Sequence, residues 1–253
     1  MRGLQVVCHM MGSVDGRILT ERWSLSAAGE AQYEAVHALH RADAWMCGRR
    51  TFQFDFQDQK RDAVYGRKGK VPPGDFISEY GGATKRGKAK KPVYAIAVDP
   101  SGKVRWESNK MRGDRLVVLT TSRAPLGYLA DLRAKSISYL IGGRSTIDFA
   151  SVLVRLHRLF GIRKLMLEGG GSINGALLAA GLVDELSLLN FPFADGAPGE
   201  PTVFDIAKDV VDEKATALQL ISAKIRPGDV VWLLYRVRAR NHRARRVSLA
   251  SAS

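Results

Sequence analysis

Residues 164–188, KLMLEGGGSINGALLAAGLVDELSL, carry the clearest structural signal in the chain. A short apolar segment at 164–167 runs into three glycines, then into an apolar helical stretch as far as Leu182, and a further strand-like segment starts at Glu185. Such a succession predicts a strand, a tight turn and a helix that leads to the next strand. Similar alternation along the chain predicts an α/β protein with a mostly parallel central sheet flanked by helices.

The other expected elements lie on both sides of this unit. Strands are expected at residues 4–10, 43–47, 92–98, 115–120 and 136–141, and helices at 29–41 and 145–160. Ser145 is the expected N-cap of the second helix. Residues 217–225 and 230–237 flank a Pro-Gly-Asp turn and predict a C-terminal antiparallel hairpin. We expect a single domain over residues 1–238.

The chain has 39 lysine and arginine residues against 25 acidic ones, a net charge of +14. Residues 60–91 contain ten basic and three acidic residues, and residues 236–253 contain six arginines and no acid, so these two segments account for +13. The first predicts a mobile, Gly/Pro-rich surface insertion at about 57–91, and the second a basic, disordered tail at 239–253. Neither shows a nucleic-acid-binding motif, so we expect no specific nucleic-acid partner.

A composition of 45% hydrophobic and 25% charged residues is typical of a globular protein. The apolar runs are shorter than the roughly 18 residues of a membrane-spanning helix, and the N-terminus shows no signal-peptide pattern. The two cysteines, Cys8 and Cys47, lie in apolar segments and are expected to be reduced core residues. We therefore expect a cytoplasmic protein without a membrane partner. The histidines, including His37 and His40 on the first helix, lack metal-ligand spacing and are interpreted as structural or surface residues.

Three groups of polar or glycine residues follow predicted strands, where open α/β sheets bind ligands. The turn Gly169, Gly170, Gly171 and Ser172 precedes a helix whose N-terminal amides suit an anion. A ligand-free tight turn would also need glycine, and Gly142-Gly143 is a second candidate for a phosphate loop. The second group follows the strand expected at 43–47 and consists of Gly48, Arg49 and Thr51. The third lies at the end of the strand expected at 115–120 and consists of Thr120, Thr121, Ser122 and Arg123. Guanidinium and hydroxyl groups suit a phosphate.

The loop SVDGR at 13–17 is either a plain turn or a cover over a ligand. Together with DAWMCG at 43–48 and the stretch 167–188, it resembles the reductase domain of riboflavin biosynthesis, the C-terminal domain of the bifunctional deaminase–reductase. That domain has the dihydrofolate-reductase-like fold. The resemblance runs from about residue 4 to about residue 236 and is interrupted by the basic insertion.

The resemblance implies a homodimeric reductase that transfers a hydride from NADPH to a phosphoribosylaminopyrimidine, opening the ribose at C1′ to a ribitylamino group. It implies that Ser13, Asp15 and Glu168 contact the substrate, with Glu168 alternatively only orienting the glycine turn. It assigns no proton donor. The cofactor-binding residues that it implies are Gly48, Arg49, Thr51, Thr120, Thr121, Ser122, Arg123, Gly169, Gly170, Gly171 and Ser172.

Two departures keep alternatives open. After Gly-x-x-Thr the family commonly has an acidic residue followed by proline, whereas residues 53–57 here read QFDFQ. The chain also lacks His-x-Glu and Pro-Cys-x-x-Cys, which excludes zinc-dependent deamination. The alternatives are a reductase of the same fold with another small substrate, such as dihydrofolate recognised by Glu30 or Glu34, and a nucleotide- or RNA-binding protein without enzymatic activity.

Overall fold

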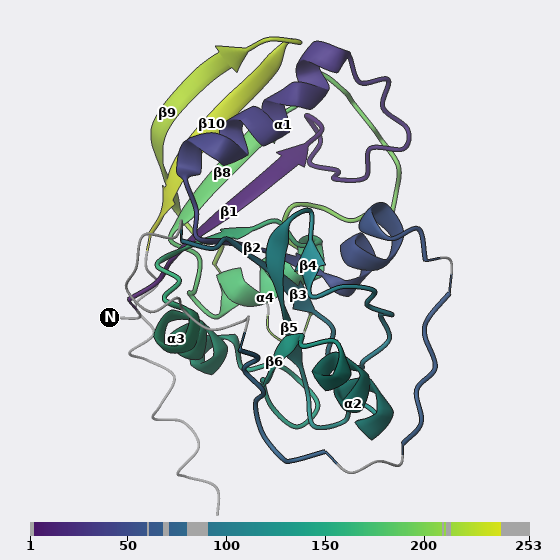
Figure 1. Cartoon of the computed structure of the whole chain (residues 1–253). Helices are drawn as coiled ribbons and strands as arrows, with labels where there is room; N and C mark the ends of the chain where they lie inside the picture. Colours follow the sequence, from purple (N-terminus) through teal and green to yellow (C-terminus); the bar gives the residue numbers. More distant parts are fainter. Residues whose placement is uncertain are drawn as a thin grey trace, which may run out of the picture.

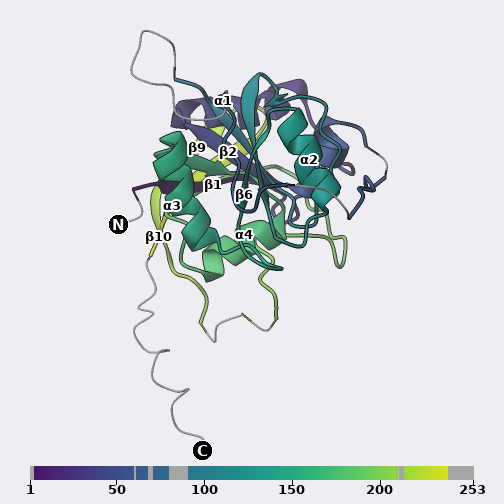
Figure 2. The same cartoon turned by 60° about the horizontal axis from the view of Figure 1, so that its bottom comes forward.

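The computed structural model describes residues 3–59, 61–67, 71–79, 91–208, 210 and 214–238. These residues form a single sheet with helices on both faces (Figures 1 and 2). The strands are β1 (Gln5–Gly12), β2 (Ala44–Gly48), β3 (Tyr94–Val98), β4 (Lys110–Met111), β5 (Asp114–Thr120), β6 (Ser138–Ile141), β7 (Lys164–Leu167), β8 (Glu185–Asn190), β9 (Leu218–Arg226) and β10 (Val230–Val237). The helices are α1 (Ala27–His40), α2 (Leu126–Ala134), α3 (Phe149–Phe160) and α4 (Gly171–Ala179), with a π-helical segment, η1 (Thr51–Phe56).

The sheet has the order β4–β5–β3–β2–β7–β1–β8–β10–β9, and β6 also pairs with β5. Its central strands are parallel, whereas β10 runs antiparallel to both β8 and β9. The predicted α/β fold, with a mostly parallel sheet and a C-terminal antiparallel hairpin, is therefore confirmed.

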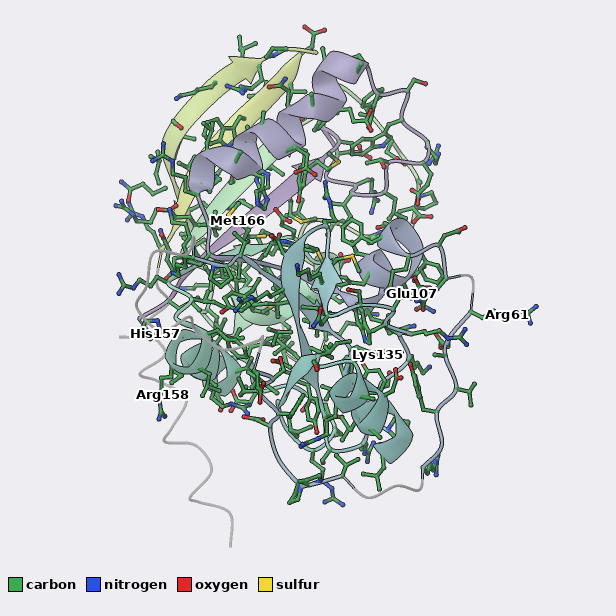
Figure 3. The ribbon with its side chains drawn as sticks, viewed as in Figure 1. Arg61, Glu107, Lys135, His157, Arg158 and Met166 are labelled. Atoms are coloured by element: carbon green, nitrogen blue, oxygen red, sulfur yellow. The ribbon has the colours of Figure 1, made fainter. Side chains whose placement is uncertain are left out.

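Successive side chains of a strand point to opposite faces of the sheet, so each face packs in a different hydrophobic core. On one face, Val6 and Cys8 pack with Leu153 of α3 and Leu177 of α4. On the other, Val7 packs in the cluster that contains Leu132 of α2, and the neighbouring His9 stacks on Tyr33 of α1. Met166 of β7 lies inside this layered body, whereas Arg61 and Arg158 point away from it (Figure 3). The pairs α1/α2 and α3/α4 thus cover opposite faces.

The predicted N-cap of α3 is wrong. The carboxylate of Asp148, not the hydroxyl of Ser145, accepts a hydrogen bond from the backbone N–H of Ser151, and α3 starts at Phe149. The backbone N–H of Asp148 donates to the carbonyl of Gly142, which holds residues 143–147 as a loop. Helix α2 and the segment η1 were not predicted from the sequence.

Described parts of the basic insertion are joined to the body by backbone hydrogen bonds. The N–H of Gly127 donates to the carbonyl of Gly66, and Phe76 and Tyr139 exchange two hydrogen bonds. The rest of the insertion, at 60, 68–70 and 80–90, and the predicted tail at 239–253 lie outside the described residues. Cys8 and Cys47 are buried and form no disulfide. In the described part of the chain, no helix is long and apolar enough to cross a membrane.

A buried polar network seats α1 on the sheet. Nε2 of His9 lies 3.2 Å from the carbonyl of Tyr33, which only accepts, so this nitrogen carries the proton and Nδ1 accepts from the hydroxyl of Ser187. The same hydroxyl oxygen accepts from Nε1 of Trp232 and from Nε2 of His40. Burial lowers the pKa of His9 to about 3 and that of His40 to about 4, so both imidazoles are neutral at pH 7. The network thereby fixes the position of the helix that carries His37.

Candidate active site

Two of the three predicted loops meet at the carboxyl end of the sheet. The backbone N–H of Glu168 donates to the carbonyl of Met46 at 2.8 Å, so the end of β7 lies beside the end of β2. A Cβ atom on Gly169 would come within 3.3 Å of the backbone nitrogen of Gly48. The absence of side chains at these two positions allows the loops that follow β2 and β7 to touch.

The three glycines after Glu168 have different surroundings. Gly169 faces Gly48, while a Cβ atom on Gly171 would overlap Asp205 and the carbonyl of Thr202. Glycine at 171 is therefore required by packing within the protein. A Cβ atom on Gly170 would meet nothing within 4 Å, and this exposed residue caps the N-terminus of α4. Gly170 is thus the position at which the backbone is open to a ligand.

The third predicted loop is joined to the turn that follows β6. The backbone N–H of Ser122 donates to the carbonyl of Gly143, and the hydroxyl of Thr121 donates to the carbonyl of Pro100. Thr120 and Thr121 are buried, whereas Ser122 and Arg123 are exposed. Only the last two therefore offer their side chains to a ligand in solution. Gly142-Gly143, the alternative phosphate loop, here supports the 120–123 loop.

A pocket of about 490 Å³ opens between the end of β3, the loop before α3 and one side of α4. We call it the α4-side pocket. Its size lies within the range of small-molecule and cofactor sites. Of the predicted cofactor-binding residues, Ser172 lines it. The lining residues are Val98, Pro100, Ser145, Thr146, Ile147, Asp148, Phe149, Ala150, Ser172, Ile173, Ala176, Ala180 and Leu182.

Arg49 is held by the basic insertion. Its guanidinium donates to the side chain of Gln53 at 2.6 Å and pairs with Asp62 at 2.5 Å. Lys103 binds the other carboxylate oxygen of Asp62 at 2.9 Å. The cations Lys103 and Arg49 hold the pKa of Asp62 below its usual range. Arg49 thus already has an anionic partner, and a phosphate would have to displace it.

A second pocket, of about 380 Å³, lies on the opposite face of the sheet between α1, η1 and the β4–β5 turn. We call it the α1-side pocket. Two predicted residues, Thr51 and Glu168, line it. The turn at 168–172 therefore separates the two pockets. The lining residues are Tyr33, Glu34, His37, Trp45, Cys47, Thr51, Asp55, Phe56, Arg112, Asp114 and Glu168.

Glu168 pairs with a histidine in this pocket. Nδ1 of His37 lies 2.5 Å from Oε1 of Glu168, and the two side chains are 26% and 9% exposed. The hydrogen bond that the imidazole donates to the carboxylate raises the pKa of His37. From the sequence His37 is interpreted as a structural or surface residue, and the structure places it in this pocket beside Glu168. Its partner lies 131 positions away in the sequence, so spacing along the helix gave no signal for it.

Three further carboxylates line the α1-side pocket. Asp114 accepts a hydrogen bond from Nε1 of Trp45, and Glu34 pairs with Arg112. Asp55 forms no hydrogen bond or salt bridge with another described residue, and desolvation at the pocket wall raises its pKa against the opposing effect of the Arg50 guanidinium. Sequence reasoning quoted Asp55 only as part of a departure from the family pattern. A lining so rich in acceptors favours a ligand with several N–H donors.

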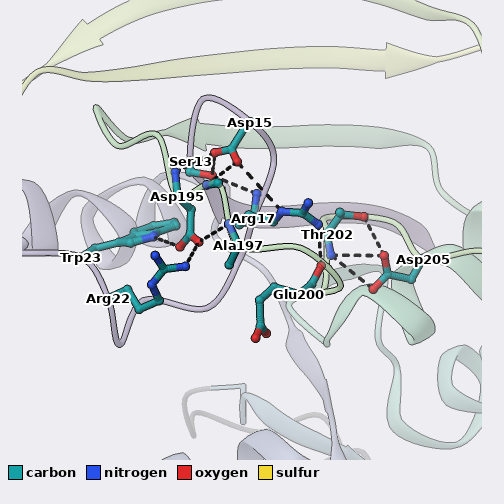
Figure 4. Close-up of polar contacts among 11 residues, drawn as sticks. Ser13, Asp15, Arg17, Arg22, Trp23, Asp195, Ala197, Glu200, Thr202 and Asp205 are labelled. Atoms are coloured by element: carbon teal, nitrogen blue, oxygen red, sulfur yellow. Dashed lines mark hydrogen bonds and ion pairs between the residues drawn. The ribbon is translucent and has the colours of Figure 1, made fainter.

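The 13–17 loop fastens a distant segment to the sheet (Figure 4). The carboxylate of Asp15 accepts hydrogen bonds from the hydroxyl of Ser13 and from the backbone amides of Asp195 and Gly196. These donors hold the pKa of Asp15 well below its usual range. Arg17 binds the carbonyl of Glu200, so the fastened segment leads into the residues that cover Gly171. In the structure both Ser13 and Asp15 serve this connection.

A mostly parallel sheet with a glycine turn before a helix, and a pocket on each side of that turn, defines an α/β protein with its ligand-binding loops at the carboxyl end of the sheet. Within this class, the chain belongs to the RibD C-terminal domain family, whose sequence model matches residues 5–232.

The relatives agree with this assignment. The chain is 30% identical to 2,5-diamino-6-ribosylamino-4(3H)-pyrimidinone 5′-phosphate reductase from Methanothermobacter thermautotrophicus over 217 residues, covering 85% of this chain and 89% of that protein. The fold is similar to that of a pyrimidine reductase-like protein from Corynebacterium diphtheriae, with a TM-score of 0.64, 17% identity and coverage of 94% and 93%. The fold is also similar to that of the riboflavin biosynthesis reductase Rib7 from Saccharomyces cerevisiae. That comparison has a TM-score of 0.57 and 17% identity, and it covers 94% of this chain and 91% of Rib7.

The glycine turn offers a matched pair of substitutions. Gly171→Ala should lower the free energy of unfolding by roughly 1–3 kcal/mol, because the new methyl group overlaps the segment 202–205. Gly170→Ala should cost less than about 1 kcal/mol, since its Cβ atom meets no neighbour and only the helix N-cap is affected. Urea denaturation of both variants measures the difference. Equal losses, or a larger loss at Gly170, would contradict the packing described for Gly171.

Proposed function

We propose that this chain is an NADPH-dependent reductase of riboflavin biosynthesis that transfers a hydride to C1′ of a phosphoribosylaminopyrimidine, giving the ribitylamino product. The similarity to the pyrimidinone phosphate reductase over 85% of the chain carries the proposal. The position of the 168–172 turn between two pockets supports it, because hydride transfer needs a cofactor and a substrate side by side.

The residues around the α4-side pocket fit a dinucleotide phosphate. Gly170 leaves the backbone open at the N-terminus of α4, where free amides and the helix dipole favour an anion, and Ser172 adds a hydroxyl. Exposed Ser122 and Arg123 are available for the 2′-phosphate of the adenosine, together with Arg49 once Asp62 is displaced. When bound, the reduced nicotinamide supplies the hydride.

The α1-side pocket fits the pyrimidine. Glu168 and Asp55 would accept hydrogen bonds from its amino and ring N–H groups, and no described residue forms a hydrogen bond with either oxygen of the Asp55 carboxylate. Asp15 and Ser13 would act from a distance, by holding the segment 195–202 in place. Glu34, which an alternative reading assigns to a pterin, is engaged by Arg112.

We also propose that two copies pair through β9. This strand ends the sheet, and Leu220 and Ile225 on it are 53% and 86% exposed. Pairing with a second copy would cover these side chains and the unpaired backbone edge. Light scattering of the purified protein should give the mass of a dimer, and the mass of a monomer would contradict this arrangement.

Turnover tests the proposed reaction. The purified protein is incubated with NADPH and either the diaminopyrimidinone or the uracil form of the ribosylamino 5′-phosphate, and the loss of reduced nicotinamide is followed together with the product mass. We expect a product that has gained two hydrogens. NADPH binding without turnover of either compound would point to a different small substrate, and dihydrofolate would be tried next. Failure to bind NADPH or NADH would remove the reductase proposal.

Replacement of Arg49 tests the cofactor side. Arg49→Ala should weaken NADPH binding about tenfold or more while changing NADH binding little, because only NADPH has the 2′-phosphate. Asp62→Asn should tighten NADPH binding, since it removes the carboxylate that pairs with Arg49. Arg50→Ala, at the exposed neighbouring position, is the control. Fluorescence titrations at moderate salt give the affinities, and equal losses for both cofactors in Arg49→Ala would exclude this role of Arg49.

A further inference from the structure

The His37–Glu168 pair leaves one imidazole nitrogen available to a ligand. Nδ1 of His37 is used by Oε1 of Glu168 at 2.5 Å. Nε2 has no hydrogen-bond partner among the described residues, although His37 lines the α1-side pocket. Both members of the pair line the same 380 Å³ space, and Glu168 directly precedes the turn toward the other pocket.

The charges around His37 favour its protonated form. Three carboxylates, those of Glu168, Glu34 and Asp114, raise its pKa, and the hydrogen bond that His37 donates to Glu168 has the largest effect. The groups near His37 that could carry a positive charge are two imidazoles and one guanidinium. The ring centre of His9 is 6.1 Å from that of His37, and His40 lies one turn further along α1. The guanidinium of Arg112 pairs with Glu34. Burial lowers the pKa of both His9 and His40, so neither adds a positive charge at pH 7.

The remaining titratable groups in the pocket leave His37 as its acid. Burial raises the pKa of Tyr33 and of Cys47 well above their ordinary values. A guanidinium, the other cationic group of the lining, is not deprotonated in proteins. Asp55 lines the opposite wall on η1, where burial raises the pKa of its carboxyl above the ordinary value and the guanidinium of Arg50 opposes that rise. Among the described lining residues, His37 has the side chain whose ordinary pKa lies closest to neutral pH, and its contact with Glu168 raises that pKa further, which suits it to give up a proton there.

We propose that His37 is the proton donor of the reductase, a catalytic residue held by Glu168 with its Nε2–H directed to the substrate. This inference rests on the proposed function. The glycosylamine nitrogen forms a double bond to C1′ as the C1′–O4′ bond breaks, and O4′ takes the proton from Nε2. The hydride then adds to C1′ and the π electrons return to nitrogen, giving the amine. One hydride and one proton are consumed, and His37 regains its proton from water.

The arrangement explains why a carboxylate stands at position 168. A neutral imidazole would be the wrong protonation state for this step, and the adjacent carboxylate raises the pKa of the ring and so favours its charged form. It also fixes the tautomer that remains after proton transfer, because Nδ1–H stays hydrogen-bonded to Oε1. Glu168 is a positioning residue with respect to this proton and a candidate substrate contact through its second oxygen.

The first measurement uses the free protein and needs no turnover. Side-chain NMR of the histidines over a pH series gives the pKa of His37 in the wild type and in Glu168→Gln. We expect a pKa above 6.5 in the wild type and a lower one in the variant, because the carboxylate is lost. A pKa of His37 that is unchanged by Glu168→Gln would overturn the proposal.

The second measurement is the pH dependence of kcat. In the wild type, kcat should fall as the pH rises through the pKa of His37, because the acid form is required, and Glu168→Gln should move this limb to lower pH. His37→Gln should lower kcat about 100-fold or more and abolish the limb, with the affinity for NADPH unchanged. His40→Gln, one turn away and outside the pocket lining, is the control for disturbance of α1.

The outcomes separate this proposal from the proposed function. If His37→Gln still turns over the pyrimidine substrate with the wild-type pH profile, the role of His37 is overturned and the proposed reductase function stands. No turnover in the wild type would overturn both. If His37→Gln does not fold, the displacement of the alkaline limb in Glu168→Gln decides the question, and an unmoved limb contradicts the proposal.

Discussion

The parallel pairing of β7 between β1 and β2 is the constraint on which the site depends. It places Glu168 beside Met46 and brings Gly169 against Gly48, so that two loops distant in sequence meet at the carboxyl end of the sheet. A side chain at Gly169 would press on the backbone of Gly48, and a side chain at Gly48 would press on Ile173. Either substitution would push the two loops apart. Because Glu168 faces α1 and the next residues begin α4, one turn borders both pockets.

The two pockets differ in the charge they present. The α1-side pocket gathers four carboxylates with one arginine and one histidine, which suits a ligand rich in N–H groups. Arg49 and Arg123 lie instead near the loops at the other side of the turn, where we propose that the cofactor phosphates bind. The large net positive charge of the chain is a separate matter, because most of it belongs to the insertion and the C-terminal segment.

Local patterns could be predicted from the sequence, and long-range partners could not. The unit at 164–188 was predictable because an apolar segment, a glycine turn and a helix are contiguous. The partner of His37 lies across the fold, and so do the amides that bind Asp15 and the segment that requires Gly171 to be glycine. The error at Ser145 has a local cause, since Asp148, three residues on, is the better-placed acceptor for a helix N–H.

Transfer of deuterium tests the central claim most directly. NADPH that carries deuterium on the transferred position of the nicotinamide is turned over with the ribosylaminopyrimidine 5′-phosphate, and the product is analysed by NMR. Direct hydride transfer predicts one deuterium at C1′ of the ribityl chain and none elsewhere. Product without deuterium at C1′, formed while NADPH is consumed, would contradict a site in which cofactor and substrate lie on either side of the 168–172 turn.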